Sequence, residues 1–496
     1  MKSVCILTLL WGLSILQVLG QCPNDNTYHE TIAAPTVLGG SVSTFLYGGE
    51  YSTVIGLVQG RVYRISTCGD NAFDSQITIY EDGTSFLEAF NDDYITCSPQ
   101  SCIYFEPLVN GSYNIVVDEY DCQDNFANFI EVTVELWDTP KPIVTIPTVV
   151  HVVYNNSTEN VSNVQIQSQI DVLNEDFGRY NSDFYNAPSR FRGFSKDTRI
   201  QFCLASRDEF GNPTTGITRT PTSHGAFTSS SEDVKYSSSG GADAWDRNKY
   251  LNLWVCNLSG TLLGYAQFPG SGIAAEDGVV VDYENFGTTG TASAPFDGGR
   301  TATHEVGHWL DLYHIWGDDA GACTGTDNVN DTPNQGGETS GCPSGAPVSC
   351  SNGGYGGDMF VNYMDYSDDG CMTMFTYWQY RRIDATMTGF RSSLQSSNGC
   401  DAPTSVNEHL NLVHTSVFPN PANASASVSI EMPNDQSKGL VFALYDITGK
   451  QVLNVSDIRY NQFQISTEEF DSGTYLYTVE TKESKVVSSG KLVIQR

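Results

Sequence analysis

Basic residues are scarce in this chain of 496 residues: 25 lysines and arginines stand against 58 aspartates and glutamates, and the formal net charge is −33. Such a surface repels phosphate backbones and anionic lipid headgroups, so nucleic acid and an acidic membrane surface are excluded as partners. Long apolar runs are also absent after the first twenty residues. No later segment is therefore expected to form a membrane span.

The first twenty residues, "MKSVCILTLLWGLSILQVLG", carry one lysine before an apolar run and end in small residues before Gln21. This pattern is typical of a secretory signal peptide, residues 1–20, that is cut before Gln21. A membrane anchor is the alternative, but the apolar core is short for a span. The protein is therefore expected to be secreted or attached to the cell surface.

Thirteen cysteines are present, and removal of the signal peptide leaves twelve. An even number in an exported chain predicts mostly disulfides, although one sequence cannot fix their connectivity. Pairs close in sequence are plausible, namely Cys97 with Cys102 and Cys342 with Cys350.

The chain is long enough for about three domains, and its patterning changes twice. Residues 21–137 alternate apolar and polar residues in short runs, which predicts an all-β sandwich of seven or eight strands. A proline-rich linker, Asp138 to Pro142, follows. Residues 143–400 mix strands with helical patterns and predict an α/β domain. Residues 417–496 return to short strands and predict a second, smaller all-β sandwich.

One long helix is expected in the α/β segment, because apolar residues recur at helical spacing in "SNVQIQSQIDVLNEDFGRYN". Ser162 or Asn163 is the expected cap, and the helix would support a sheet from one side.

Histidine is rare, yet three of the eight histidines fall within "TATHEVGHWLDLYH", residues 301–314. His304 and His308 are four residues apart and so share one face of a helix, with Glu305 beside them. His314 cannot reach that face by helical spacing, so the chain is expected to leave the helix after about Leu310 and turn back.

Three histidines and one glutamate are the ligand set and the base of a zinc hydrolase. Catalytic zinc keeps three protein ligands and leaves one position open for water, whose pKa it lowers towards ~7. His304, His308 and His314 are the candidate ligands, and Glu305 would take the proton from the attacking water. A structural zinc site would need a fourth protein ligand instead, and a site that only binds would leave Glu305 unexplained.

Fifty residues after His314 comes "NYMDYSDDGCMTMFTYWQYRRI". An extended zinc motif leads one to expect a tight turn here that places Met364 below the metal as an apolar floor. Tyr366 could reach the metal or hydrogen-bond the oxyanion. As alternatives, Met364 fills a core and Tyr366 is a packed aromatic.

The motifs "HEVGHWLDLYH" and "NYMDYSDD" resemble the metzincin metallopeptidases, in particular the pappalysin family in its bacterial cytophagalysin and ulilysin-like branch. The similarity extends from Ile146 to about Leu394. It implies zinc ligands at His304, His308 and His314, the base at Glu305, the Met-turn at Met364 and an auxiliary tyrosine at Tyr366. It also implies that "GYAQFPG" is the strand at which an extended substrate pairs, with Gly264, Tyr265 and Ala266 as the binding residues.

Asp311 departs from that family, which carries glycine at this position to end the helix with a left-handed backbone. Aspartate reaches this conformation at modest cost, so Asp311 is predicted to have a positive φ with an intact site. A distorted or inactive site is the alternative.

The loop "GDDAGACTGTDNVNDTPNQ" resembles the calcium-binding loop of ulilysin-like members. Asp327, Asp331 and Thr332 are the candidate calcium ligands, and a solvated acidic loop is the alternative.

Cys68 is a candidate inhibitory zinc ligand in an uncleaved precursor.

Two further resemblances concern the flanking segments. Residues 21–137 are similar to the pre-peptidase, carbohydrate-binding-like sandwiches of secreted bacterial proteases. "VFPNPA", "LYDITGK" and "GKLVIQR" resemble the C-terminal sorting domain of the type IX secretion system, which implies the secretion machinery as a partner; a generic adhesive module is the alternative.

The predicted function is that of an exported zinc endopeptidase acting on protein or peptide substrates, with Zn²⁺ and Ca²⁺ as cofactors. The alternative is a catalytically inactive surface adhesion or glycan-binding protein with a zincin-like domain. The sequence leaves open whether residues 21–142 are a removed propeptide or a retained module.

Overall fold

The structure is a computed structural model that describes residues 22, 24–94, 96–122, 125–345, 347–352, 356–401, 414–431, 440–456, 458, 462–480 and 486–496. The predicted signal peptide, residues 1–20, lies outside the described residues. Among the residues that are described, no helix has both the length and the apolar character that a membrane crossing requires.

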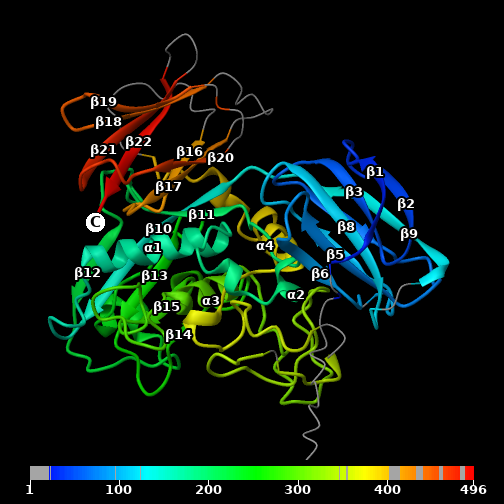
Figure 1. The fold of residues 1–496 in the computed structure, drawn as a ribbon. Helices are drawn as coiled ribbons and strands as arrows, with labels where there is room; N and C mark the ends of the chain where they lie inside the picture. Colours follow the sequence, from blue (N-terminus) through cyan, green and yellow to red (C-terminus); the bar gives the residue numbers. More distant parts are fainter. Residues whose placement is uncertain are drawn as a thin grey trace, which may run out of the picture.

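The N-terminal segment forms two sheets that share one apolar core, here called the N-terminal sandwich (Figure 1). The five-stranded sheet has the order β1 (Thr27–Ala33), β3 (Glu50–Leu57), β8 (Gly111–Glu119), β5 (Ser75–Glu81), β6 (Leu87–Asn91). The four-stranded sheet has the order β2 (Ser41–Gly48), β9 (Asn125–Asp138), β4 (Val62–Ser66), β7 (Cys102–Phe105). Nine described strands exceed the expected seven or eight. Strand β1 is almost wholly exposed, so it lacks the apolar alternation by which a strand is recognised.

A mixed sheet carries the central segment, which is α/β as predicted. Its order is β11 (Ile200–Leu204), β10 (Val144–Tyr154), β13 (Leu251–Cys256), β15 (Val279–Asp282), β14 (Gly264–Ala266), and β12 (Ile217–Pro221) pairs with β10. All its pairings are parallel except that of β14 with β15, which places a short antiparallel strand at one edge.

Helices cover this sheet. Helix α1 (Asn163–Phe177) is capped by Ser162, one of the two predicted caps, whose side chain accepts the Gln165 N–H. Its apolar face, with Ile166, Ile170 and Leu173, joins the core of the sheet. The remaining helices are α2 (Ser189–Arg192), α3 (Arg300–Trp309) and α4 (Tyr377–Thr388). Helix α3 packs against α1, β14 and β15, which brings the predicted histidine helix to the antiparallel edge.

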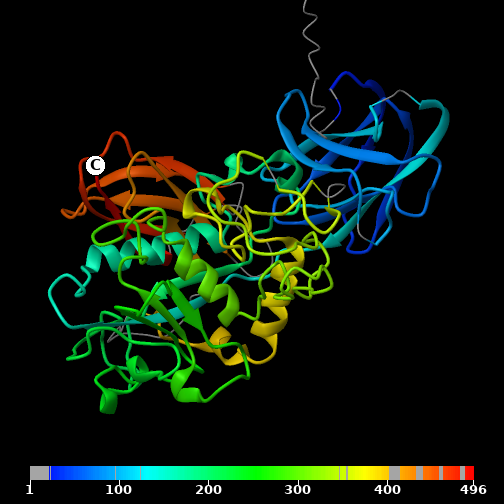
Figure 2. The same cartoon turned by 90° about the horizontal axis from the view of Figure 1, so that it is seen from below.

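The C-terminal segment forms two more sheets around a core of its own, here called the C-terminal sandwich. One has the order β16 (His414–Phe418), β17 (Ser425–Glu431), β20 (Gln462–Ser466). The other has the order β19 (Gln451–Val455), β18 (Val441–Tyr445), β21 (Gly473–Glu480), β22 (Val486–Ile494). Viewed from below, the two sandwiches lie on different sides of the central domain (Figure 2).

Ten cysteines form five disulfides: Cys22–Cys122, Cys68–Cys97, Cys203–Cys400, Cys323–Cys350 and Cys342–Cys371. The prediction of mostly disulfides is confirmed. The predicted pairs Cys97–Cys102 and Cys342–Cys350 are wrong, because the fold brings together cysteines 27 or 29 residues apart rather than the nearest ones. Cys102 and Cys256 are buried free thiols. The hypothesis of Cys68 as an inhibitory zinc ligand is also wrong, because its sulfur is bonded to Cys97.

Candidate active site

Three imidazoles converge beside helix α3. His304 and His308 lie on one face of the helix, His314 follows the turn, and one ring nitrogen from each lies within 4.8 Å of the others. The Nε2 atoms of His308 and His314 are 3.1 Å apart. Two nitrogens that bind one tetrahedral zinc at ~2.0 Å are separated by roughly 3.3 Å, so these imidazoles fit the ion with little movement. No other group of three or more metal-binding side chains at this spacing occurs among the described residues.

The outer nitrogen of each ring is held by an oxygen. His304 Nδ1 lies 2.7 Å from the Tyr363 carbonyl, and His308 Nδ1 lies 2.8 Å from the Leu312 carbonyl. His314 Nδ1 is 2.8 Å from the Asp318 carboxylate. These contacts place the proton on Nδ1 and aim the Nε2 lone pair inward, as metal-binding histidines require. Burial, followed by the neighbouring His314, lowers the pKa of His308 to about 4, so this ring stays neutral.

Asp311 makes the turn that returns His314 to the cluster. Helix α3 ends at Trp309 with Leu310 as its C-cap, close to the expected end, and Asp311 has a φ of 78°. The predicted positive φ is confirmed. The Asp311 carboxylate pairs with Arg382 at 2.7 Å, and the Asp311 N–H donates to the His308 carbonyl. These contacts offset the cost of a left-handed backbone at a residue other than glycine.

Met364 is fully buried and packs against helix α3 at Gly307. A Cβ on Gly307 would approach the Met364 sulfur to 2.4 Å, so the helix can rest on this side chain only with glycine at position 307. Met364 therefore packs against helix α3 at Gly307, and its role as the apolar floor below the metal stays a prediction. Tyr366 is half exposed, and its ring centroid is 5.4 Å from that of His304 and 5.0 Å from that of His314.

Glu305 is buried between α3 and the edge strand β14. A Cβ on Gly264 would lie 2.9 Å from Glu305 Cγ and 2.9 Å from the Val280 carbonyl, so strand and carboxylate are in close contact. Burial raises the pKa of Glu305 to about 8. A cation bound by the three imidazoles would lower it again, because a nearby positive charge favours the carboxylate.

A substitution at Gly264 should therefore disturb the site by displacing the Glu305 side chain. We expect Gly264→Ala to lower kcat/KM by about tenfold or more, because the methyl group must push the Glu305 side chain or β14 out of place. Kinetics on a peptide substrate measure the effect. The matched control Gly225→Ala, where a Cβ meets nothing within 4 Å, should leave kcat/KM unchanged.

The other two residues of the edge strand differ in their surroundings. The Tyr265 hydroxyl donates to Glu232 at 3.1 Å, and the Lys235 ammonium lies 4.9 Å from its ring centroid. The Tyr265 side chain therefore anchors β14 to Glu232 and Lys235. Ala266 pairs with Val279 and ends the strand.

The candidate calcium residues are buried in one loop but make different contacts. Asp327 accepts a hydrogen bond from the Thr332 hydroxyl at 2.7 Å. Asp331 accepts from the Thr376 hydroxyl at 2.7 Å and the Trp378 N–H at 2.9 Å, so both its oxygens serve the start of α4. Burial raises the pKa of Asp327 and of Asp331 to about 7.

Several residues around the histidines were missed in the sequence. Asp318 contacts His314 from four residues further along the chain, a spacing visible in "HIWGD". Trp316 stacks on the His314 ring, with centroids 4.3 Å apart. The carbonyl of Tyr363, by contrast, has no signal in the sequence, because any residue could supply it.

Comparison with known proteins places this geometry in a family context. The Peptidase_M43 family, described as pregnancy-associated plasma protein-A, matches residues 235–388. The secretion system C-terminal sorting domain matches residues 416–495. An extracellular metalloprotease of Arthroderma otae is 34% identical over 257 residues, which cover 50% of this chain and 80% of that protein. One of Verticillium alfalfae is 45% identical over 152 residues, which cover 29% of this chain and 51% of that protein.

Among solved structures, mature mirolysin of Tannerella forsythia in complex with a cleaved peptide is similar to this chain. The sequences are 52% identical, the TM-score is 0.52, and the match covers 53% of this chain and 100% of mirolysin.

Proposed function

Because this chain belongs to the pappalysin family of metallopeptidases, we propose that it is a zinc-dependent endopeptidase that hydrolyses internal peptide bonds of protein substrates. The observation that carries the proposal is the convergence of His304, His308 and His314 beside the buried Glu305. In this assignment the three Nε2 atoms hold the zinc. Zinc in such a site supplies Lewis acidity, which lowers the pKa of water and polarises a carbonyl.

Glu305 is the general base in this proposal. Its carboxylate takes a proton from the attacking water and passes it to the nitrogen of the departing amine. The close contact with β14 fixes the carboxylate beside the strand where the scissile bond would lie. Its burial excludes bulk water that would compete for that proton.

The substrate would bind in extended form along β14. This strand is the last at its edge of the sheet and pairs with β15. The backbone groups on its free side can pair with a peptide by strand addition. Mirolysin has been solved with a cleaved peptide. We assign the backbone of Gly264, Tyr265 and Ala266 to this contact.

Tyr366 would hydrogen-bond the oxyanion that forms on the scissile carbonyl. We expect Tyr366→Phe to lower kcat by about 10–100-fold with little change in KM, because the contact arises only in the transition state. Steady-state kinetics with a peptide substrate test this. An equal rise in KM at unchanged kcat would instead assign Tyr366 to substrate binding.

The protein is secreted or attached to the cell surface, since it carries a secretion sorting domain and its relatives are extracellular proteases. We propose that the signal peptide directs the first step of export and that the C-terminal sandwich is recognised by the type IX machinery.

The competing hypothesis, an inactive adhesion or glycan-binding protein, rested partly on Asp311. Asp311 makes the left-handed turn and is paired with Arg382, so this motive for an inactive site is weakened. The experiment that separates the two functions is hydrolysis of casein by the purified secreted protein. We expect hydrolysis that a zinc chelator abolishes and added zinc restores. Absence of hydrolysis by fully zinc-loaded protein would contradict the proposal.

Calcium is proposed as a second cofactor, held by the loop of Asp327 and Thr332. A calcium-selective chelator should lower Tm by roughly 5–10 °C. The reason is that a cation whose free concentration is ~100-fold above its Kd stabilises a domain by about 2.7 kcal/mol. Differential scanning fluorimetry at constant zinc measures the shift. An unchanged Tm would contradict calcium binding by this loop.

A further inference from the structure

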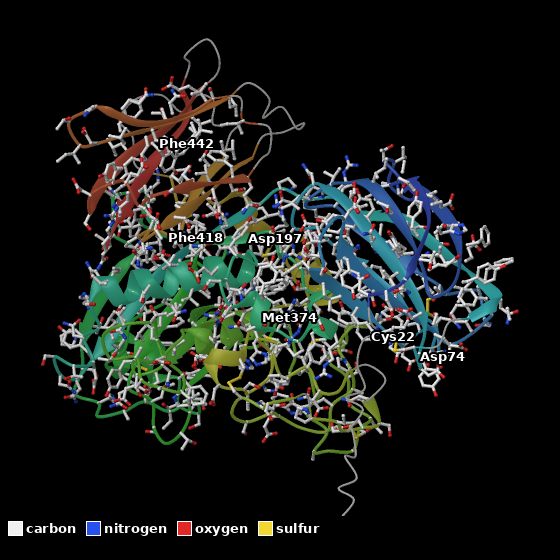
Figure 3. The ribbon with its side chains drawn as sticks, viewed as in Figure 1. Cys22, Asp74, Asp197, Met374, Phe418 and Phe442 are labelled. Carbon is white, nitrogen blue, oxygen red and sulfur yellow. A yellow bond between two sulfur atoms is a disulfide. The ribbon has the colours of Figure 1, made fainter. Side chains whose placement is uncertain are left out.

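The N-terminal sandwich meets the central domain through buried charges. Glu106, directly after β7, receives the Lys196 ammonium at 2.7 Å and the Arg179 guanidinium at 3.2 Å. The side chains of Glu106 and Lys196 are each 3% exposed and that of Arg179 is 9% exposed. Burial alone would raise the pKa of Glu106, but the two cations outweigh it and hold the pKa below its ordinary value. Asp197, labelled at this junction in Figure 3, donates its N–H to the same carboxylate.

Aromatic rings close the same junction. Tyr104 of β7 stacks on Tyr377 of α4, with ring centroids 5.1 Å apart and an interplanar angle of 10°. Trp378 meets the edge of Tyr104, and Tyr380 is buried in the same cluster. If the sandwich left, Tyr377 and Tyr380, now at most 2% exposed, would face solvent. An aromatic patch of this kind on an exported protein favours aggregation.

The backbones also approach closely. A Cβ on Gly193 of the central domain would lie 2.6 Å from the Ala89 Cβ and 3.3 Å from Ile103 Cγ2, both in the sandwich. The two surfaces therefore fit at van der Waals distance rather than through a layer of water.

The C-terminal sandwich gives a comparison within the same chain. Its contacts with the central domain include a hydrogen bond from Gln201 to Ser416 at 3.1 Å and one from Tyr180 to Gln462 at 3.4 Å. The rings of Tyr180 and Phe418 are 6.5 Å apart. These contacts are hydrogen bonds and a distant ring pair, whereas the N-terminal sandwich is joined to the central domain by buried ion pairs and a ring stack.

The N-terminal sandwich also lies away from the catalytic groups and instead supports α4. In the part of the chain that the structure describes, the hydrogen-bond and ring contacts of the three histidines come from residues 268–366. Gln379, two residues after Tyr377, exchanges amide hydrogen bonds with Asn362, and Asn362 Oδ1 accepts the Met364 N–H. The helix that the sandwich supports is therefore bonded to the turn below the histidines.

We infer that the N-terminal sandwich is a retained part of the mature enzyme, docked on Lys196, Arg179 and α4 as a structural support, and is not a propeptide removed on activation. The inference does not depend on the proposed catalytic function, because docking can be measured without proteolysis.

The first test is N-terminal sequencing of the secreted, active protein. We expect a start before Thr27, where β1 begins. A start at any later residue would overturn the inference.

The second test cuts the chain between the two parts, so that only their docking can hold them together. A recognition site for a specific protease is inserted after Pro140, the secreted protein is cut there, and the fragments are passed over a size-exclusion column at micromolar concentration. We expect the wild-type fragments to co-elute and Gly193→Leu to separate them, because the larger side chain cannot fit against Ala89. The matched control Gly225→Leu, at a position with open space, should co-elute. Separation of the wild-type fragments, or co-elution of the Gly193→Leu fragments, would overturn the inference that the sandwich stays docked.

Discussion

Glu305→Gln is expected to lower kcat/KM on an unfolded protein substrate by about 10²–10⁴-fold while the purified variant keeps one zinc per chain. Glutamine preserves the shape of the side chain but cannot take a proton. The three imidazoles keep their Nδ1 partners, none of which is Glu305, so metal binding should be unaffected. Metal analysis and kinetics on the same preparation measure both quantities.

Two controls make this result specific. Glu338→Gln alters an exposed carboxylate near Tyr366 and should leave the rate unchanged. His308→Ala should lose zinc and activity together, because it removes a ligand. A Glu305→Gln variant that cleaves as fast as the wild type would remove Glu305 from the mechanism. One that has lost its zinc would indicate a structural role instead.

The site was predictable where local geometry determines it. The helical period alone places His304 and His308 together, and the need to return His314 predicts the end of α3 near Leu310. The positive φ at Asp311 was predicted instead from the resemblance to a family that carries glycine at this position. The cap Ser162 was also predictable, because a cap and its N–H partner lie within one turn.

Contacts between distant segments were not predictable. The oxygen that orients His304 comes from Tyr363, 59 residues away, and it is a backbone atom that carries no sequence signal. Disulfide pairing failed for the same reason: Cys342 lies near Cys350 in sequence but pairs with Cys371. The fold, rather than the spacing in sequence, brings the Cα atoms of two cysteines close enough for a disulfide to join their sulfurs.

Asp176 is expected to give the largest loss of stability among the residues behind the site. It lies at the end of α1, is 2% exposed, and accepts hydrogen bonds from Thr303 at 2.6 Å and Tyr363 at 2.9 Å. It also pairs with Arg300 at 3.2 Å. Burial raises the pKa of Asp176 to about 6, although Arg300 and the two hydroxyls act in the opposite direction.

Asp176→Ala should lower the free energy of unfolding of the central domain by about 3–5 kcal/mol, because it leaves Arg300 with Asp183 as its remaining ion-pair partner and two buried hydroxyls without an acceptor. Urea denaturation followed by tryptophan fluorescence measures this, since Trp309 is buried in α3. Zinc affinity should fall by about 10–100-fold as well, because Thr303 precedes His304 and the Tyr363 carbonyl orients it.

The matched control is Asp171→Ala on the same helix. Asp171 is partly exposed and is hydrogen-bonded to Gln167 at 3.0 Å, so its loss should change the free energy of unfolding by less than about 1 kcal/mol. If both variants lost the same stability, the effect would belong to α1 as a whole. If Asp176→Ala unfolded more easily but bound zinc as tightly as the wild type, Asp176 would stabilise the core without orienting the metal ligands.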